Sequence, residues 1–560
     1  MKKKQSYIFP VFFILLPAIL FLIITIVQCG RSGVGLSLPM PKWNDEAAYY
    51  ELIKTWLATG MPEGYWGFGG GHAIIGTGSA WSPAILLPYA VWGEMFGWTY
   101  GSVAAANVAF LCIANAVVLL LCRPDKQGVW GLVLLEMFSG HILLYMNTVM
   151  SEVLRYALAI VLAAMLYRLL FEEEERENRI FRYILVPVYI IVVTQIYIFF
   201  AFAVPIYVFA IYRRKKWYWR AILAFLAMAV EAGGSYYLLH LISSNYNIYK
   251  AEMLLKALED RDIFGAVRTF LWMFRAGLID LWNCFLSYTG YGMFRWFVPL
   301  LGVFVCLPLL ALCGDGAKYL KNRKEAQNAF WNSDRQILLI VCYSVLLFVT
   351  MYITVYSLEA FTLYRGVGIV LLFSMVLLLR MERKKWGCLF LALYATGILF
   401  VPKNQTDFNG ERYPGAETVE SWTELAEELD EAMPLQTEDS GAEMGEEELR
   451  WANTAVLYTM EPKLICAMPA GMGVNFAMYS DEIVEEAGYL VFSLEERENL
   501  RPDWLEQSHR DIYEKYGKVL EDRYFIQYAD DEYIIYKKAG DDKPISEIAD
   551  PDIVDRNISV

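Results

Sequence analysis

The sequence predicts an α-helical polytopic membrane protein that ends in a small α/β domain. Of its 560 residues, 57% are hydrophobic and 20% are charged, against roughly 25% charged in soluble globular proteins. The apolar residues fall in blocks of about 20, the length of helix that spans the hydrocarbon core of a bilayer. Residues 1–402 carry 34 basic and 24 acidic side chains, whereas residues 403–560 carry 14 and 38. A basic membrane region is therefore followed by a strongly acidic tail.

This charge distribution argues against nucleic-acid binding, because a phosphate backbone needs a clustered basic face on the soluble part of a protein. The nine cysteines are scattered and form no Cys-x-x-Cys pair, so neither a zinc site nor a disulfide framework is expected. There is no phosphate-binding loop of the Gly-x-x-x-x-Gly-Lys type and no Gly-x-Ser-x-Gly elbow. ATP-driven pumps and common hydrolases are therefore disfavoured.

The first apolar segment follows Lys2, Lys3 and Lys4 and runs from Tyr7 to Val27. No small-residue cleavage motif follows it, so we expect a retained helix rather than a signal peptide. The other apolar segments lie near 101–122, 129–150, 152–170, 183–212, 219–242, 292–313, 336–356, 365–380 and 386–402.

Basic clusters at 213–216, 318–324 and 383–385 predict cytoplasmic ends for the segments beside them. The segment 183–212 has basic residues at both ends, which favours two short helices turning near Thr194 and Gln195. That gives about 11 membrane helices and an extracytoplasmic C-terminal tail. A single tilted helix at 183–212 is the alternative, and it would invert the topology after it.

This topology predicts three regions: a transmembrane domain at 1–402 with outer loops at 29–100 and 243–291, an acidic helix and linker at 403–449, and an extracytoplasmic α/β domain at 450–560. In the outer loops, helical spacing predicts helices over 45–57 and 252–271. The first is expected to lie flat at the membrane interface. In the tail we expect helices at 416–432 and 503–516 and strands at 454–460, 463–468, 489–493, 519–528 and 532–537.

The motif Trp43-Asn44-Asp45-Glu46-x-x-Tyr49 places two adjacent carboxylates just beyond the first membrane helix. Asp45 and Glu46 are suited to accept a proton from a substrate or to hold a divalent cation such as Mg²⁺ or Mn²⁺. The alternative is structural, because acidic residues also stabilise the first turn of a helix. The spacing alone leaves both interpretations open.

A first helix, an outer loop that opens with Asp45-Glu46, a Gly-rich aromatic stretch at 64–72 and a closing Phe96-Gly97 resemble the GT-C superfamily of membrane glycosyltransferases. The similar branch uses polyprenyl-phosphate sugars, as in the protein mannosyltransferase-like and aminoarabinose transferase-like families. The resemblance implies that Asp45 is the catalytic base. Those families often carry His-Pro-Pro, where this chain has Trp81-Ser82-Pro83 and an earlier His72. With Tyr49, His72 and Trp81 are the expected substrate-binding residues.

A second candidate group begins at Ser151-Glu152, expected at the next outer turn. Glu152, Arg155 and Tyr156 share one face of a helix. A Ser-Glu here is similar to a feature of bacterial GT-C enzymes, which makes Glu152 a candidate catalytic residue. The alternative is an N-cap at Ser151 and an Arg155–Glu152 pair hidden from lipid. A charged group at membrane depth is costly enough to favour function.

The leaving group of a polyprenyl-phosphate donor is a phosphate that is already ionised, so cations stabilise its departure and no acid is needed. The guanidinium group of arginine forms two parallel hydrogen bonds that match the geometry of a phosphate. Arg365 is the first candidate for binding the donor phosphate, followed by Arg275, Arg268 and Arg155. For each of them the alternative is snorkelling toward lipid headgroups.

Together these features predict a cell-membrane glycosyltransferase that moves a sugar, hexose or pentose, from a polyprenyl-phosphate donor to an envelope glycan, lipid or protein acceptor on the outer face, with inversion. No cofactor beyond a divalent metal is expected, and no nucleic acid. The alternative from another class is a transporter or flippase of lipid-linked glycans. An outer-face sensor or scaffold is a third.

Overall fold

The computed structural model divides the chain into two compact units, which are described separately. Unit 1 comprises residues 1–36, 104–237 and 247–413, and unit 2 comprises residues 37–103, 238–246 and 414–560. Most of the predicted first outer loop, from residue 37, thus shares a unit with the acidic tail from residue 414. The structure describes residues 8–60, 66–68, 82–137, 139–171, 179–212, 215–242, 249–287, parts of 337–350, 360–379, 412–436, 445–459, 461–476, 486–494 and 509–539.

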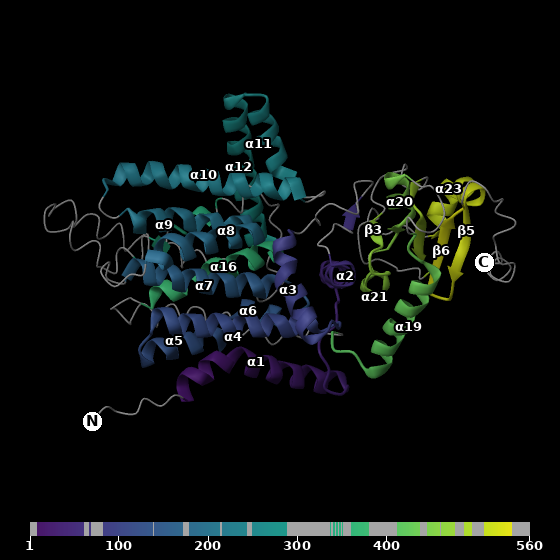
Figure 1. Cartoon of the computed structure of the whole chain (residues 1–560), viewed down its shortest axis with the longest axis horizontal. Coiled ribbons are helices and arrows are strands. Elements are labelled where there is room, and N and C mark those ends of the chain that lie inside the picture. The colour runs from purple at the N-terminus through teal and green to yellow at the C-terminus, as the bar shows by residue number, and fades with distance from the viewer. Residues whose placement is uncertain are drawn as a thin grey trace. The chain divides into compact units, whose positions relative to one another are not determined.

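Among the described residues, four helices are long and apolar enough to cross a membrane. They belong to α1 (Ile8–Ser32), α4 (Ser102–Cys122), α7 (Glu152–Phe171) and α10 (Trp217–Ile242). Within unit 1, α4 and α7 run in the same direction (Figure 1). These helices match the predicted segments to within a few residues and make the chain a membrane protein.

A fifth apolar helix, α16 (Ala360–Leu378), packs closely against α7. At Gly368 a Cβ atom would lie 2.8 Å from the Tyr156 ring, so the contact requires glycine. The predicted segments 292–313 and 386–402 lie outside the described residues and 336–356 is described only in part. The count of eleven spans therefore stays a prediction.

The predicted single segment at 129–150 is wrong. It is two shorter helices, α5 (Lys126–Met137) and α6 (Gly140–Tyr145). The Ser139 hydroxyl accepts a hydrogen bond from the backbone N–H of Ile142 at 3.3 Å and so caps the start of α6. A serine that offers its side chain to the backbone favours a new helix start over continuation.

The predicted division of 183–212 into two helices is confirmed. A π-helical turn at Phe181–Leu185 leads into α8 (Val186–Ile196), and a 3-10 turn at Ile198–Phe202 leads into α9 (Ala203–Ile211). Between them, Tyr197 has an extended backbone with φ −154°. The break lies two residues beyond the predicted turn.

The chain reverses at this break, because its two ends meet. The Arg182 guanidinium donates a hydrogen bond to the carbonyl of Ile211 at 3.1 Å, and the Tyr207 hydroxyl donates to the carbonyl of Arg182 at 3.1 Å. The aromatic residues of the 3-10 turn are buried, as non-helical backbone at membrane depth requires. A chain that reverses in this way returns to the side from which it came.

The predicted helix over 252–271 is also two helices, α11 (Tyr249–Glu259) and α12 (Ile263–Ser287), which pack on each other as a hairpin. Arg261 has a positive φ of 57° at the turn. Asp262 then accepts a hydrogen bond from the N–H of Gly265 at 2.8 Å, which starts α12. The helical spacing of the sequence continues through this turn, so the pattern alone did not reveal it.

Unit 2 is built on a mixed sheet with the strand order β1-β3-β2-β4-β6-β5 in its described part. The pairs β1–β3, β3–β2 and β2–β4 are parallel, and β4–β6 and β6–β5 are antiparallel. The strands are β1 (Trp66–Phe68), β2 (Thr454–Leu457), β3 (Gly473–Phe476), β4 (Tyr489–Ser493), β5 (Tyr524–Ala529) and β6 (Tyr533–Lys538). The edge strand β1 comes from the first outer loop, whereas all the others come from the tail.

The predicted strands at 454–460, 489–493 and 532–537 correspond to β2, β4 and β6. The strand predicted at 463–468 is wrong: this stretch is α21 (Pro462–Ala467), because Pro462 occupies the first helical position, where proline favours a helix start. The strand predicted at 519–528 begins only at residue 524.

The helices of the tail were predicted with mixed success. The helix α19 (Ala416–Ala432) has the predicted bounds, while α23 (His509–Arg523) extends seven residues beyond the predicted end. A further short helix, α20 (Glu446–Ala452), begins in the predicted linker and ends in the predicted α/β domain.

An aromatic core lies on one face of the tail sheet. Tyr458 stacks on Phe492 with ring centroids 4.3 Å apart, and Tyr536 meets Phe492 edge-on at 5.8 Å. The Tyr524 hydroxyl donates a 2.7 Å hydrogen bond to the carbonyl of Ala487, so this buried tyrosine is satisfied. The predicted boundaries at 402 and 449 stay predictions.

Candidate active site on helix α2

The predicted acidic pair lies in the first turn of α2 (Asn44–Thr59). Glu46 is fully buried, and its Oε2 accepts hydrogen bonds from the backbone N–H groups of Lys42 at 2.7 Å and Trp43 at 3.0 Å. This carboxylate satisfies donors that the start of a helix leaves without intrahelical partners. The structural interpretation therefore holds for Glu46. Its neighbour Asp45 is half-buried and lies at the positive end of the helix dipole.

Most of α2 is enclosed rather than lying flat with one open face. Tyr49, expected to bind substrate, is 2% exposed and belongs to the core of unit 2. On the other side of the helix Glu51 and Thr55 are buried as well. The helix packs between α3 (Pro83–Phe96) and α21, so both its apolar and its polar side chains have protein neighbours.

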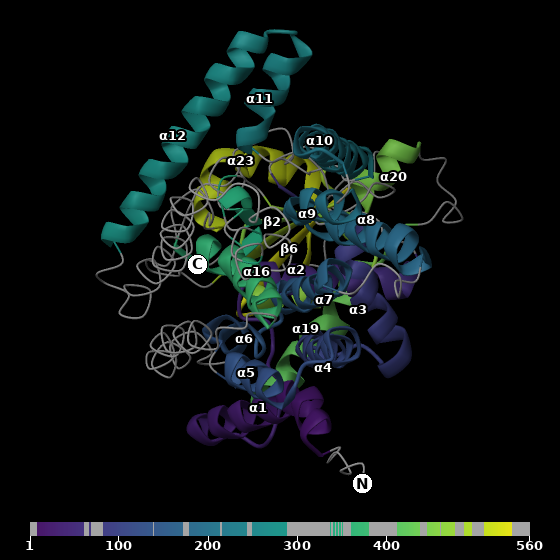
Figure 2. The same cartoon turned by 90° about the vertical axis from the view of Figure 1, so that its left-hand side faces the viewer.

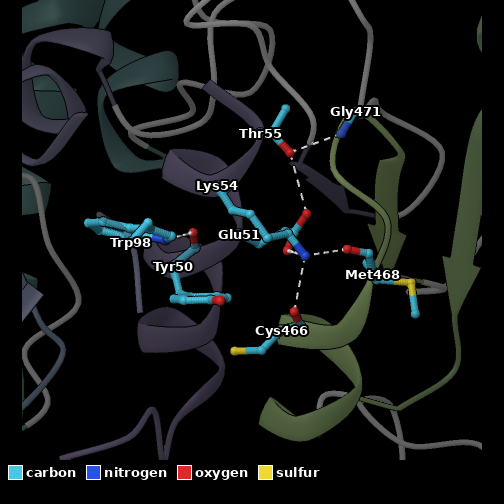
Figure 3. Close-up of polar contacts among 8 residues, drawn as sticks. All are labelled: Tyr50, Glu51, Lys54, Thr55, Trp98, Cys466, Met468 and Gly471. Carbon is cyan, nitrogen blue, oxygen red and sulfur yellow. Dashed lines mark hydrogen bonds and ion pairs between the residues drawn. The ribbon is translucent and has the colours of Figure 1, made fainter. Parts of the chain in front are cut away.

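A polar cluster of Glu51, Lys54 and Thr55 connects α2 to the loop that follows α21 (Figure 3). The Lys54 ammonium lies 2.6 Å from Glu51 Oε2 and donates to the carbonyl oxygens of Cys466, at 3.1 Å, and Met468. These carbonyls belong to the end of α21, where helix carbonyls lack intrahelical donors. A lysine from the first outer loop therefore caps a helix of the tail.

Thr55 extends this polar cluster. Its hydroxyl donates to Glu51 Oε1 at 3.3 Å and accepts from the backbone N–H of Gly471 at 3.1 Å. Gly471 has a φ of +96°, which a side chain would strain, and an added Cβ would lie 3.0 Å from Leu435. The glycine at 471 thus has a structural reason.

Burial dominates the electrostatics of this cluster. It raises the pKa of Glu51 from 4.5 to about 7, although the neighbouring Lys54 and Thr55 lower it. Burial also raises the pKa of the Cys466 thiol well above its usual value, with Glu51 adding to the effect. A carboxyl group with a pKa near neutrality is common at functional sites, but structural ion pairs produce it too.

The end of the first outer loop supports the middle of α2. The Trp98 indole N–H donates to the carbonyl of Tyr50 at 3.2 Å. The Tyr50 ring stacks with Trp98 and Tyr100, with centroids 5.9 Å and 5.0 Å apart. At Gly93 an added Cβ would lie 2.6 Å from Leu57, so α3 approaches α2 closely there. The helix that carries Asp45 is thus fixed along its length.

The second candidate group lies at the start of α7 in unit 1. Glu152 is 2% exposed, and its Oε1 lies 3.7 Å from the Arg155 guanidinium. That guanidinium lies over the Tyr197 ring, 4.7 Å from its centroid, at the break between α8 and the 3-10 turn. The ion pair expected from the spacing is therefore present, with a cation–π contact that the sequence did not indicate.

The remaining predicted site residues are placed less completely. His72 and Trp81 lie outside the described residues. Arg365 belongs to α16, and only its backbone is described. Arg268 and Arg275 are exposed on α12. Asp45 and Glu46 belong to unit 2 and the arginines and Glu152 to unit 1.

The predicted metal site lacks support from the described ligands. Within that part of the chain, no group of three or more His, Cys, Asp or Glu side chains could hold a metal ion. Asp45 and Glu46 supply two carboxylates, and Glu46 Oε2 already accepts two backbone hydrogen bonds. Divalent cations such as Mg²⁺ use more oxygen ligands than this pair offers.

The sequence did not predict the polar cluster. Glu51 and Lys54 are spaced as an i, i+3 pair, which was a local signal for an ion pair. Their partners lie more than 400 residues later in the chain, and no local pattern identifies such contacts.

No protein-family model and no curated protein matches the sequence. Among solved structures, the chain is similar to the oligosaccharyltransferase of Archaeoglobus fulgidus in its apo form, with 14% identity and a TM-score of 0.45 over 97% of this chain and 76% of that one. It is also similar to ArnT from Cupriavidus metallidurans bound to undecaprenyl phosphate, with 12% identity and a TM-score of 0.36 over 95% of this chain and 99% of that one.

The first of these proteins is described as an oligosaccharyltransferase, and the second was solved with undecaprenyl phosphate. Their TM-scores lie below 0.5 and their identities are at most 14%. The activity proposed next therefore depends on the residues of this chain.

Proposed function

We propose that the protein is a membrane glycosyltransferase that moves a sugar from a polyprenyl-phosphate donor to an envelope acceptor on the outer face. The observation that carries this proposal is the position of Asp45, a half-buried carboxylate on a helix that contacts within unit 2 hold along its length. Glu46 is engaged in capping the helix, while Asp45 beside it is half-buried on a firmly held helix. A partly desolvated carboxylate in a fixed position is suited to general-base catalysis.

In this mechanism Asp45 accepts the proton of an acceptor hydroxyl as the hydroxyl oxygen attacks the anomeric carbon. The bond between that carbon and the phosphate oxygen breaks on the opposite side, so the configuration inverts. The polyprenyl phosphate leaves as an anion, and Arg365 with Arg155 is assigned to neutralise it. General-base assistance of this kind is worth roughly 10²–10⁴-fold in rate.

The outer-face location depends on the topology. The reversal at α8 and α9 supports it, because the contact between Arg182 and Ile211 returns the chain to one side of the membrane. With this reversal, the basic stretches at 318–324 and 383–385 remain cytoplasmic by the positive-inside rule. Nucleotide sugars are cytoplasmic, so an outer-face enzyme needs a lipid carrier for its activated sugar.

The tail is assigned a supporting role in the same reaction. Its loop at 466–471 holds α2 through Lys54 and Thr55, and its sheet takes β1 from the loop that follows α2. We assign to it the positioning of the helix that carries the base.

The test is a transfer assay with the purified full-length chain in detergent. Undecaprenyl-phosphate carrying a radiolabelled sugar is supplied with envelope extract, and labelled product is separated from labelled lipid. Time-dependent transfer that is lost in Asp45→Asn supports the enzyme. If the protein instead moves intact lipid-linked sugar across vesicles without forming product, it is the flippase of the alternative hypothesis.

A further inference from the structure

The hairpin of α11 and α12 exposes an apolar surface that none of the preceding functions uses. Ile263, Phe264, Val267 and Leu271 recur at helical spacing and are 72%, 91%, 53% and 58% exposed. Leu278 continues the stripe two turns later and is 45% exposed. Contiguous apolar surfaces of this kind mark an interaction site. We call these five residues the α12 stripe.

The other side of α12 is different in character. Ala266 and Met273, seven residues apart, are buried, so this face has protein neighbours. Thr269 and Asp280 also lie away from the stripe by helical position. The helix is therefore packed on one side and exposes its most apolar side on another.

The hairpin runs crosswise to the spanning helices of unit 1. In Figure 1, α4 and α7 run horizontally while α11 and α12 stand upright. Figure 2, turned by 90°, looks along α4 and α7 and shows α12 along its whole length, extending beyond the other helices of the unit. Helices that cross a bilayer define its normal, so α12 runs along the membrane plane.

Basic side chains lie between the stripe and two further exposed apolar residues, Ile279 and Trp272, which are 48% and 53% exposed. Arg268 and Arg275 are seven residues apart, so they lie on one side of α12, next to the apolar positions. Both are exposed. An apolar stripe with cations along its edge matches a lipid leaflet, where acyl chains lie beside phosphate groups.

We propose that the α11–α12 hairpin is embedded in the surface of the bilayer, with the α12 stripe among the acyl chains and Arg268 and Arg275 on the phosphates of anionic lipids. Asp262 accepts a hydrogen bond from the N–H of Gly265 at the start of α12, and α11 packs against α12 after the turn. The proposed partner of the α12 stripe is the bilayer itself, so this contact forms without the sugar donor.

Photocrosslinking in the full-length chain tests the embedding. Benzoylphenylalanine is introduced separately at Phe264 and Leu271, with Thr269 as the matched control two residues away on the same helix. Each variant is reconstituted in vesicles of phosphatidylcholine and phosphatidylglycerol with radiolabelled acyl chains. We expect several-fold more lipid adduct at positions 264 and 271 than at 269. Equal adduct at all three positions, no adduct, or crosslinks to a polypeptide would overturn the proposal.

A second measurement tests the arginines. Arg268→Gln and Arg275→Gln are compared with the unchanged protein by native mass spectrometry of lipids retained from mixed vesicles. Each substitution should lower the retention of phosphatidylglycerol relative to phosphatidylcholine by about fivefold, since a basic residue near an anionic membrane surface contributes on that scale. An unchanged lipid ratio in the double variant would overturn the assignment of the arginines.

Discussion

The ammonium group of Lys54 donates a 3.1 Å hydrogen bond to the carbonyl oxygen of Cys466, 412 residues later in the chain. The same ammonium forms an ion pair with the buried carboxylate of Glu51, three residues earlier on α2. One side chain therefore neutralises a buried charge and also caps a helix of the tail. The stability of the tail and the position of α2 depend on the same few atoms.

Lys54→Met should destabilise unit 2 by about 1–3 kcal/mol, because it leaves buried carbonyl oxygens and a carboxylate without their donor. Differential scanning fluorimetry and limited proteolysis of the full-length protein would measure this loss. Lys463→Met is the matched control. Its ion pair with Glu532, at 2.6 Å, joins a half-exposed partner, so its loss should cost less than about 1 kcal/mol. Equal effects of the two substitutions would contradict the structural role of Lys54.

The stability of unit 2 should fall as the pH rises toward and through 7. Burial raises the folded-state pKa of Glu51 from 4.5 to about 7, so the folded state binds this proton more tightly than the unfolded state. The contribution of this proton to the free energy of unfolding is fully present below about pH 4.5 and is lost as the pH rises through 7. The free energy of unfolding should fall by up to about 1.4 kcal/mol per pH unit in this range.

Glu51→Gln, which resembles the protonated form, should therefore melt at a higher temperature than the unchanged protein above pH 7. The difference should shrink on acidification. Melting curves recorded across this range would measure it, and a variant that is less stable at alkaline pH would contradict the prediction.

Gly471→Ala should destabilise the α2–tail contact by roughly 1–2 kcal/mol, because a side chain is strained at positive φ. The residue has a φ of +96°, and Leu435 crowds the added Cβ. Gly445→Ala provides the control, since Gly445 has a φ of −66° and open space around it. Unfolding midpoints should drop clearly for the first variant and less for the second, because Gly445 is the N-cap of α20 and loses only a modest cap preference.

Asp45→Asn should reduce sugar transfer by at least about 100-fold while leaving expression and melting temperature unchanged. Asparagine is close in shape to aspartate but accepts no proton at neutral pH. Glu46→Gln should be milder, because an amide oxygen still accepts the backbone hydrogen bonds of Lys42 and Trp43. Near-normal turnover in Asp45→Asn would remove the proposed base.

Arg365→Ala should raise the apparent donor KM by roughly tenfold or more, the loss expected for a charge-assisted phosphate contact of about 1.5–3 kcal/mol. Arg365→Lys should restore it only in part, since an ammonium cannot form the two parallel hydrogen bonds of a guanidinium. Initial rates over a range of donor concentrations would decide. An unchanged KM would indicate that Arg365 snorkels toward headgroups instead.

The local features of the fold were predictable from the sequence. The helix at 416–432 has a strong amphipathic period and the predicted bounds. The break in 183–212 followed from charge at both of its ends, and the structure has it at Tyr197. In both cases the signal lies within the segment itself, where hydrophobic period or charge placement determines the outcome.

The errors concern features that depend on single residues or distant partners. The short apolar stretch 463–468 was predicted as a strand, but Pro462 starts a helix there. The three-residue strand β1 pairs with β3 across the sequence, and three residues are too few to carry a pattern. In the candidate site, Asp45 and Glu46 were predicted to act together. In the structure Glu46 caps α2, and Lys54 and Thr55 contact distant residues of the tail, which no local pattern indicates.

The pairing of β1 with β3 also has a consequence for biosynthesis. The strand and α2 leave the ribosome about 400 residues before their partners, which at roughly 5–20 residues per second is a delay of some 20–80 s. During this interval the first loop has neither its neighbouring strand nor the carbonyls that Lys54 binds. A chain that terminates early has its spanning helices, but its first loop stays accessible to proteases. The first loop can therefore reach its final structure only after the tail has been synthesised.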